Sequence, residues 1–408
     1  MTSWKIYKLG DIADIQTGPF GSQLHNKDYA LVGSPIVTVE HLGNRHFTTQ
    51  NLPLVSDTDK ARLSKYILSE GDIVFSRVGS VDRCSYVSDK EVGWLFSGRC
   101  LRVRCNREVY PLYIYYYFCL ESVKQYIRNV AVGATMPSIN TQIMSEIPIS
   151  LPSLEEQRRI AGILGAIDDK IENNRRINTN LELQAQALYK QWFVDFEFPN
   201  EEGKPYKSFG GKMVDSELGL IPEGWSVGAL SDLADITMGQ SPNGKSFNEN
   251  GEGIVFYQGR TEFGIRYPSI RLYTTEPTRY AEPMSVLLSV RAPVGDINIA
   301  TQKCCIGRGV ASIKSKTDDN AYMYCCLKEL RPQLDQYNGE GTVFGSINRK
   351  ELEGLALCIP KNEVISQFNN LVLGMDRQML NLFQQTQNLA TLRDTLLPKL
   401  MNGEIITQ

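Results

Sequence analysis

The chain has 408 residues, of which 42% are hydrophobic and 22% are charged, a composition typical of a soluble globular protein. This length allows two or three domains, each able to bury its own core. The formal net charge of −3 argues mildly against a protein that binds nucleic acid without help. There is no apolar run of about 18 residues and no apolar leader, so we expect a cytoplasmic protein that does not enter a membrane.

Cysteine and histidine do not occur in a pattern typical of a metal site. The nine cysteines show no CxxC spacing, and the three histidines, His25, His41 and His46, all lie in the first half. We therefore predict no bound metal and reduced thiols, as in a cytoplasmic protein.

The first predicted domain spans residues 1–151 and is mixed but mostly β. Short apolar runs such as Ser34–Val39 and Asp72–Phe75 are bounded by Gly, Pro, Asn and Asp, as strands between turns are. Apolar and aromatic residues crowd Leu112–Val130, which predicts a short helix. Its aromatic side chains at 113–118 could stack on bases, but core packing is the stronger interpretation.

A long helix is predicted over residues 152–194, with Ser153 as the N-cap. Its apolar positions alternate by four and three, which is typical of a coiled-coil seam. The predicted seam residues are Ile160, Leu164, Ile167, Ile171, Leu181 and Leu188. Asn174 and Asn178 interrupt this seam, and buried asparagines often fix helix register. The alternative interpretation is a core helix of a compact bundle.

The second half repeats this order after a connector. Residues 195–225 are acidic and rich in Gly and Pro, so we expect no regular structure there. Residues 226–360 are again β-rich, with a helix expected at Ala321–Leu334. A second long helix is predicted over residues 361–403, fading after Leu396 because Pro398 and Gly403 break helices. Its predicted seam residues are Phe368, Val372, Met375, Met379, Leu389 and Leu396.

These similarities indicate a duplication. Leu9–Gly18 resembles Leu230–Gly239 at an offset of 221, and Gly133–Asn140 resembles Gly341–Asn348 at an offset of 208. The offset of 208 continues through the two seams. A period this long indicates duplicated domains rather than a repeat array. Because neither helix can bury its seam alone, we expect the two helices to pack antiparallel.

The search for catalytic motifs finds none. There is no GxxxxGK[ST], GxSxG or HExxH sequence, and the second half has no histidine. What the halves share is polar, glycine-bearing loops, which suit phosphate oxygens and base edges. These loops are residues 17–24, 76–83 and 133–140 in the first half, and 239–248, 290–297 and 341–348 in the second.

Arg77 and Arg291 take matching places in these loops by sequence. They are predicted to face DNA, and the alternative is that each pairs with a carboxylate, Asp82 or Asp296. The triplets at 138–140 and 346–348 are expected to cap and turn the chain. The candidate DNA-binding residues are Ser22, Gln23, Lys27, Arg45, Arg77 and Arg83 in the first half, and Gln240, Lys245, Asn248, Arg260 and Arg291 in the second.

Four segments carry a resemblance that extends over essentially the whole chain. They are Trp192–Pro199 (WFVDFEFP), Gly210–Trp225, Ser153–Ile171 and Thr395–Ile405. With the order of domain, helix, domain, helix, they resemble the specificity (S) subunit of type I restriction-modification systems. The start of the second helix, near Asn362, is less charged than the family pattern.

The resemblance implies an α+β fold with two target recognition domains similar to the specificity domain of TaqI-like methyltransferases. Two long helices would separate these domains and form an antiparallel coiled coil. Each domain would read one half of a bipartite site in double-stranded DNA, while the helices set the spacing and dock two modification subunits. Restriction subunits would join the complex. S-adenosylmethionine, ATP and magnesium would belong to these partners, and the chain itself would not be an enzyme.

Two other function classes stay open at this point. A methyltransferase with fused recognition domains should carry a methyl-donor pocket and a proline-rich catalytic tetrapeptide, and neither is recognisable in the sequence. A cytoplasmic coiled-coil scaffold that binds only proteins would bind no DNA, even with modification subunits present. The DNA target cannot be deduced, because base readout depends on three-dimensional placement.

Overall fold

The computed structural model describes residues 4–20, 23–25, 28–43, 45–339 and 345–405. The chain divides into two compact units, Met1–Glu172 with Gln387–Gln408, and Asn173–Thr386. Each unit therefore holds one β-rich region, one segment of helix α6 (Leu154–Tyr189) and one segment of helix α11 (Asn362–Met401).

The first unit is built on two four-stranded sheets and a strand pair. One sheet has the order β2-β9-β6-β7, the other has the order β3-β5-β4-β8, and β1 pairs with β10. Within them only the pair β4–β8 is parallel. The strands are β1 (Lys5–Lys8), β2 (Ala13–Thr17), β3 (Tyr29–Ala30), β4 (Ser34–Val37), β5 (Leu54–Val55), β6 (Ile73–Ser76), β7 (Cys84–Tyr86), β8 (Leu95–Phe96), β9 (Cys100–Cys105) and β10 (Pro148–Leu151), and the short helices are α1 (Leu9–Ile12), α2 (Asp57–Arg62), α3 (Pro111–Cys119), α4 (Glu121–Val130) and α5 (Thr141–Ser145).

The second unit repeats this topology with one additional strand, β18, and the repetition confirms the duplication. Its sheets have the orders β14-β22-β19-β20 and β15-β17-β16-β21-β18, and β13 pairs with β23. The pair β16–β21 is parallel, as β4–β8 is in the first unit. The strands are β13 (Ser226–Ala229), β14 (Ala234–Met238), β15 (Phe247–Asn248), β16 (Ile254–Tyr257), β17 (Tyr273–Thr274), β18 (Tyr280–Ala281), β19 (Val286–Ser289), β20 (Ile297–Ile299), β21 (Cys304–Ile306), β22 (Val310–Ser315) and β23 (Ala356–Ile359), and the short helices are α7 (Leu230–Leu233), α8 (Asn320–Glu329), α9 (Arg331–Asp335) and α10 (Arg349–Glu353).

The helix expected at Leu112–Val130 is two helices. Leu120, between α3 and α4, has φ −60° and ψ 131°, so the chain leaves the helix there while the Leu120 side chain stays in the core. Tyr113, Tyr116 and Phe118 are buried in the same core, which confirms the core-packing interpretation. In the second unit the helix expected at Ala321–Leu334 is also two helices, α8 and α9, separated at Leu330, whose φ of −73° and ψ of 1° mark a smaller break than that at Leu120.

The connector contains regular structure, so that expectation was wrong. Strands β11 (Met213–Ser216) and β12 (Gly219–Pro222) form an antiparallel hairpin, and Gly219 supplies the φ of +92° that the turn requires. Buried aromatic rings hold the segment, because Phe198 stacks on Trp225 with ring centroids 5.0 Å apart. Packing thus orders a segment whose composition favours loops.

Both long helices begin where the sequence predicted. Ser153 Oγ accepts a hydrogen bond from the Glu156 backbone N–H at 3.3 Å, as an N-cap does. Helix α11 runs on through Pro398 to Met401, although a fade after Leu396 was expected. Leu397, Leu400 and Met401 in this last stretch are buried in the core of the first unit, and their burial offsets the loss of the hydrogen bond that proline removes.

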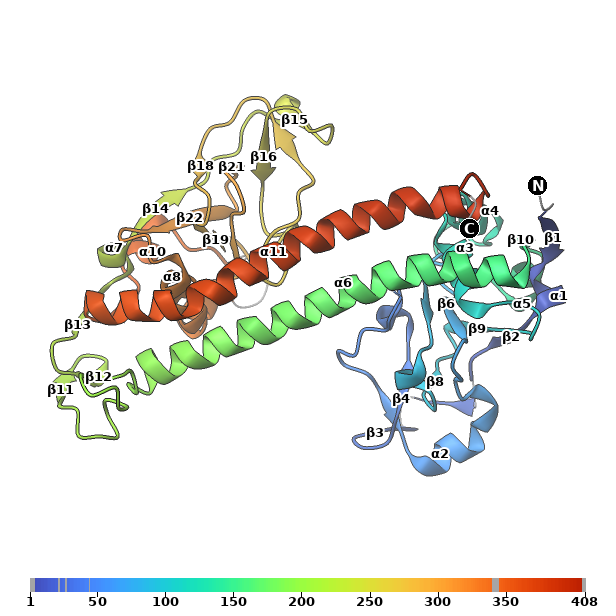
Figure 1. Ribbon diagram of the computed structural model, residues 1–408, viewed down its shortest axis with the longest axis horizontal. Coiled ribbons are helices and arrows are strands. Elements are labelled where there is room, and N and C mark those ends of the chain that lie inside the picture. The colour runs from blue at the N-terminus through green and yellow to red at the C-terminus, as the bar shows by residue number, and fades with distance from the viewer. Residues whose placement is uncertain (1–3, 21–22, 26–27, 44, 340–344, 406–408) are drawn as a thin grey trace. The chain divides into compact units, whose positions relative to one another are not determined.

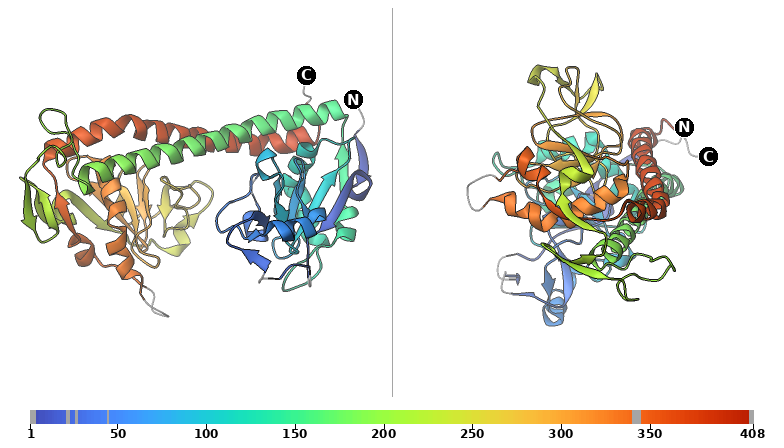
Figure 2. Two further views of the ribbon diagram at one scale, coloured as in Figure 1. Left: turned by 90° about the horizontal axis from the view of Figure 1, so that it is seen from below. Right: turned by 90° about the vertical axis from the view of Figure 1, so that its left-hand side faces the viewer.

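In each unit a segment of α6 (green) lies beside a segment of α11 (red), as Figures 1 and 2 show. The helices are antiparallel. In the second unit, Asn174 Nδ2 donates to Gln385 Oε1 at 2.8 Å, and later in α6 Glu182 shares an arginine with Asp376, which lies earlier in α11. None of the described helices is long and apolar enough to cross a bilayer.

Phe368→Ala should destabilise the second unit by about 3–5 kcal/mol, because it removes a fully buried ring. The Phe368 ring lies 5.2 Å from that of Phe193 and 5.9 Å from that of Trp192. Urea unfolding followed by tryptophan fluorescence would measure the loss. Leu371→Ala, three residues along α11 and 52% exposed, is the control and should change stability by less than about 0.5 kcal/mol. Equal losses for both variants would contradict this packing.

Candidate nucleic-acid interface and helix contacts

In the first unit the three predicted polar loops meet at one end of the sheet β2-β9-β6-β7. The Gly79 N–H donates to Pro137 O at 2.8 Å, and the Ile139 N–H donates to Arg77 O at 2.9 Å. Gly18, at the end of β2, lies so close to the neighbouring backbone segment that a Cβ there would come within 2.1 Å of Ser97 O, and only glycine permits this approach. These hydrogen bonds and this close contact bring the glycine-bearing loops together on one surface.

The second unit brings its loops together in the same way. The Gly239 N–H donates to Val310 O at 3.0 Å, and the Ile347 N–H donates to Val290 O at 3.1 Å. A Cβ on Gly239 would come within 2.2 Å of Gly307 O. We call these two surfaces the loop edges: residues 17–20, 76–83, 97–100 and 131–140 in the first unit, and 239–248, 290–297, 307–310 and 345–348 in the second.

The sequence prediction missed one loop of each edge, the tight turns at 97–100 and 307–310. The Cys100 N–H donates to Ser97 O at 2.9 Å, and the Val310 N–H donates to Gly307 O at 3.0 Å. Each turn presents an exposed arginine, Arg99 or Arg308. Each turn contains a Gly-Arg dipeptide just ahead of a strand, Gly98-Arg99 before β9 and Gly307-Arg308 close before β22, and this match could have indicated both turns.

Arg77 and Arg291 do not take matching places in the two units, so the prediction made from their loop sequences was wrong. Backbone N–H groups at 139 and 347 donate to the carbonyls of Arg77 and Val290, so these two residues correspond. Likewise, Val78 and Arg291 both pair with the serine of the last loop. In extended backbone a shift of one residue turns the side chain to the opposite face. The two edges therefore present their arginines differently.

The alternative partners of these arginines are occupied by other residues. Asp82 accepts from Arg128 at 2.6 Å, and Asp296 accepts from Arg331 at 2.7 Å and from Arg260. Arg77 donates to the backbone oxygen of Gly98 at 3.3 Å. Among the residues that the structure describes, no carboxylate forms an ion pair with Arg77 or Arg291, so the expected pairing alternative is not found.

Three other candidates of the first half make internal contacts. Arg45 donates to Asp169 of α6 at 2.8 Å, and its side chain is only 14% exposed, which corrects the expectation that it faces DNA. Arg83 donates to a backbone oxygen, that of Leu42. Gln23 Oε1 accepts from the Tyr66 hydroxyl at 2.6 Å. Ser22 and Lys27 lie outside the described residues.

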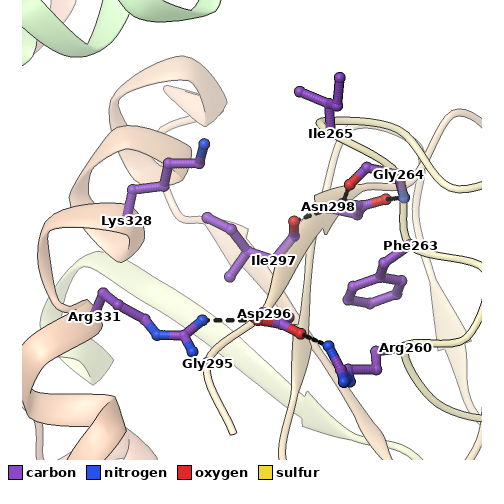
Figure 3. A pocket seen from close by; sticks show the side chains of 10 residues that line it. All are labelled: Arg260, Phe263, Gly264, Ile265, Gly295, Asp296, Ile297, Asn298, Lys328 and Arg331. Atoms are coloured by element: carbon purple, nitrogen blue, oxygen red, sulfur yellow. Dashed lines mark hydrogen bonds and ion pairs between the residues drawn. The ribbon is translucent and has the colours of Figure 1, made fainter. Parts of the chain in front are cut away.

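In the second half two candidates are exposed and two are not free. Gln240 and Lys245 are exposed on the loop after β14. Asn248 shapes its own loop, because its Oδ1 accepts the Glu252 N–H at 3.0 Å. Arg260 pairs with Asp296 in a hollow of about 310 Å³ (Figure 3).

This hollow contains cations that are already paired. Arg260 and Arg331 approach Asp296 from two sides, and Lys328 lies 2.9 Å from Glu182 of α6. Burial alone would raise the pKa of the Asp296 carboxyl, but the hydrogen bonds from Arg331 and Arg260 outweigh burial and leave that pKa below its ordinary value. The ion pairs in this hollow therefore link secondary-structure elements, and none of its three cations is left unpaired to bind a ligand.

Asn140 and Asn348 have the structural role expected of their triplets. Asn140 Oδ1 accepts the Ile143 N–H at 2.8 Å and begins α5, and Asn348 Oδ1 accepts the Glu351 N–H at 3.1 Å and begins α10. No group of His, Cys, Asp or Glu within the described part of the chain could hold a metal ion.

All twelve predicted seam residues are buried or half-buried. Part of each seam packs on the unit's own domain rather than on the other helix. Ile160 and Leu164 belong to the core of the first domain, and Phe368 and Val372 to that of the second. The seams therefore combine domain packing with helix packing.

Comparison with known proteins gives consistent matches. The model of the type I restriction modification DNA specificity domain matches residues 1–183 and 222–387. The putative type I restriction enzyme MjaX specificity subunit of Methanocaldococcus jannaschii is 36% identical over 375 residues, which cover 88% of this chain and 84% of the relative. The HindI specificity subunit of Haemophilus influenzae is 24% identical and covers 99% of this chain and 100% of its own. The crystal structure of the S subunit from M. genitalium shares the fold, with a TM-score of 0.61 at 15% identity over 98% of this chain and 96% of that one.

Replacing Asp296 should alter the acid side of the stability profile. A carboxyl whose folded pKa is lowered stabilises the fold above its unfolded pKa, about 3.9, and loses this contribution as pH falls through the folded value. The stability difference between wild type and Asp296→Asn should therefore shrink as pH falls from about 6 to about 3. Urea unfolding at several pH values measures it, and a difference that is constant with pH would contradict the paired state of Asp296.

Proposed function

The chain belongs to the family of type I restriction-modification specificity subunits, and from this premise we propose that each β-rich domain reads one half of a bipartite DNA target. The subunit is not catalytic, and its task is recognition of the DNA target. The observation that supports the division of this task is the pair of loop edges, which recur at the same end of the equivalent sheets.

The loop edges have the chemistry that DNA recognition needs. Arg77 and Arg99 on the first edge, and Arg291 and Arg308 on the second, form no ion pair among the described residues. Guanidinium groups donate two parallel hydrogen bonds to guanine O6 and N7, or to phosphate. Gln240 and Lys245 add further donors on the second edge. We propose these side chains as the DNA contacts, in place of Arg45 and Arg260.

The proposed recognition domains are residues 1–151 and 226–360. The helices at 152–194 and 361–403, with the connector 195–225, would set the spacing between half-sites and dock two modification subunits. Exposed apolar residues recur at equivalent places on the two helices, since Ile163 is 39% exposed and Leu371, 208 positions later, is 52% exposed. Two such sites suit two copies of one partner.

The partners would supply what this chain lacks. S-adenosylmethionine would bind the modification subunits, and ATP and magnesium the restriction subunits, within a cytoplasmic complex. The net charge of −3 fits this division, because bulk phosphate attraction can come from the modification subunits that enclose the duplex.

The function is tested by sequencing the methylated bases in a strain that expresses this chain with its cognate modification subunit. We expect one split motif with two half-sites and a spacer of constant length. The purified chain alone, supplied with methyl donor, should modify no DNA. A continuous motif would contradict the two-domain reading, and an absence of DNA methylation and of DNA binding in the complex would favour the protein-binding scaffold.

Arg291→Ala should weaken recognition of one half-site by about 1–3 kcal/mol, the range for a lost bidentate base contact. Methylation rates on duplexes altered in one half-site at a time would show which half-site is affected. Arg349→Ala is the matched control, because Arg349 is exposed in the same domain but pairs with Glu353 at 2.7 Å. If Arg291→Ala lowers the thermal stability and leaves sequence preference unchanged, the side chain has a structural role instead.

A further inference from the structure

One buried arginine of the second unit holds both long helices. Arg266 donates through Nη1 to Glu182 of α6 and through Nη2 to Asp376 of α11, the latter at 2.6 Å. All three side chains are buried, and that of Arg266 is only 5% exposed. The guanidinium also lies over the Tyr324 ring, 4.2 Å from its centroid. We call Glu182, Arg266 and Asp376 the buried triad.

The charges of the triad are mutually dependent. Burial alone would lower the pKa of the Arg266 guanidinium, but the Asp376 and Glu182 carboxylates raise it. The two carboxyls differ, because Glu182 has a second cation in Lys328 at 2.9 Å. Burial raises the pKa of Asp376, which has Arg266 as its cation, whereas the two cations outweigh burial at Glu182 and lower its pKa.

This geometry constrains how α6 and α11 can slide past each other. The guanidinium is a rigid planar fork, so each carboxylate must lie at one Nη position. A shift of either helix along its axis would leave a buried carboxylate without its cation, which is strongly destabilising. An apolar seam is less exacting, because a shift by one heptad replaces one apolar contact with another. Polar residues inside a seam are the established means of selecting one register.

An equivalent junction exists in the first unit. Arg45 corresponds to Arg266. The Arg45 carbonyl accepts from the Tyr86 N–H of β7 at 2.9 Å, and the Arg266 carbonyl accepts from the Ile299 N–H of β20 at 2.8 Å. Strands β7 and β20 are equivalent, because they pair with β6 and β19. Asp168 corresponds to Asp376 at the offset of 208. Asp168 accepts from the Tyr116 hydroxyl of its domain at 2.7 Å and from Arg393 of α11 at 2.8 Å. A buried carboxylate thus joins a domain to both helices in each unit.

We propose that the buried triad fixes the register between α6 and α11 and thereby the spacer length that the protein accepts between its two half-sites. The inference rests on the proposed function, and it makes Arg266 a positioning residue that acts on spacing rather than on base readout. The Asn174–Gln385 hydrogen bond of 2.8 Å, between the same two helices, supports the same register.

The test replaces the whole triad with apolar residues of similar size, as Glu182→Met, Arg266→Met and Asp376→Leu together. Removing all three charges leaves no unpaired ion at the three triad positions. Lys328 loses its partner Glu182, but its side chain is 31% exposed and can be hydrated, so the variant is expected to fold with a Tm close to that of the wild type. Complexes reconstituted with the modification subunits are then assayed for methylation of duplexes whose spacer is one base pair shorter than, equal to or longer than the wild-type spacer.

We expect the triple variant to lose spacer discrimination by about tenfold or more while both half-site sequences stay the same. Arg349→Met with Glu353→Leu, an exposed pair of the same domain, is the control and should keep full discrimination. A folded triple variant with wild-type discrimination would overturn the proposal, because a purely stabilising role does not alter spacer choice.

Arg266→Lys provides a second measurement if the triple variant fails to fold. Lysine keeps the charge but cannot form the fork to two carboxylates, so discrimination should fall by a smaller factor. Unchanged discrimination in a folded Arg266→Lys complex would also overturn the proposal. A wild-type complex that recognises no split motif would instead overturn the proposed function, and this outcome is seen before any variant is made.

Discussion

Neither long helix can bury its apolar face by itself, and the rest of the structure follows from how that surface is covered. The start of each helix packs into the domain that precedes it, through Ile160 and Leu164 in the first unit and through Phe368 and Val372 in the second. The last turns of α11 enter the core of the first unit through Leu397 and Leu400. Helix and domain are therefore one folding unit, and each compact unit contains parts of both helices.

Polar contacts also join the two helices, in addition to their apolar seams. Buried ion pairs contribute little net stability, because desolvation of the charges offsets their attraction. Their effect is to exclude alternative arrangements, since a misplaced helix would leave a buried carboxylate unpaired. The placement of Asp168 and Asp376 at equivalent positions shows that the duplication retained this device in both units, although the cations come from different elements.

The duplicated domains agree in their sheets and differ in their loop edges. Equivalent strands keep the same order and register, and β18 adds one strand to the second unit. The loop arginines, in contrast, stand one residue apart in the β6–β7 and β19–β20 loops and again in the two tight turns. A shift of one residue in an extended chain changes the direction of a side chain but costs the core nothing. This arrangement suits a protein whose two halves share a scaffold and read different sequences.

The sequence by itself determined the duplication, both long helices and the absence of recognisable catalytic motifs, because these depend on local pattern and on comparison of one half with the other. It could not predict the β11–β12 hairpin, since packing of Phe198 against Trp225 overrides a composition that favours loops. The sequence also led to the prediction that Arg45 and Arg260 contact DNA, whereas the tertiary structure pairs them with Asp169 and Asp296. Residue type and loop context cannot distinguish an arginine that faces solvent from one that a distant carboxylate neutralises. Only the folded chain brings residues 45 and 169, or 266 and 376, within hydrogen-bonding distance, and so only the tertiary structure decides which charges remain free to meet a ligand.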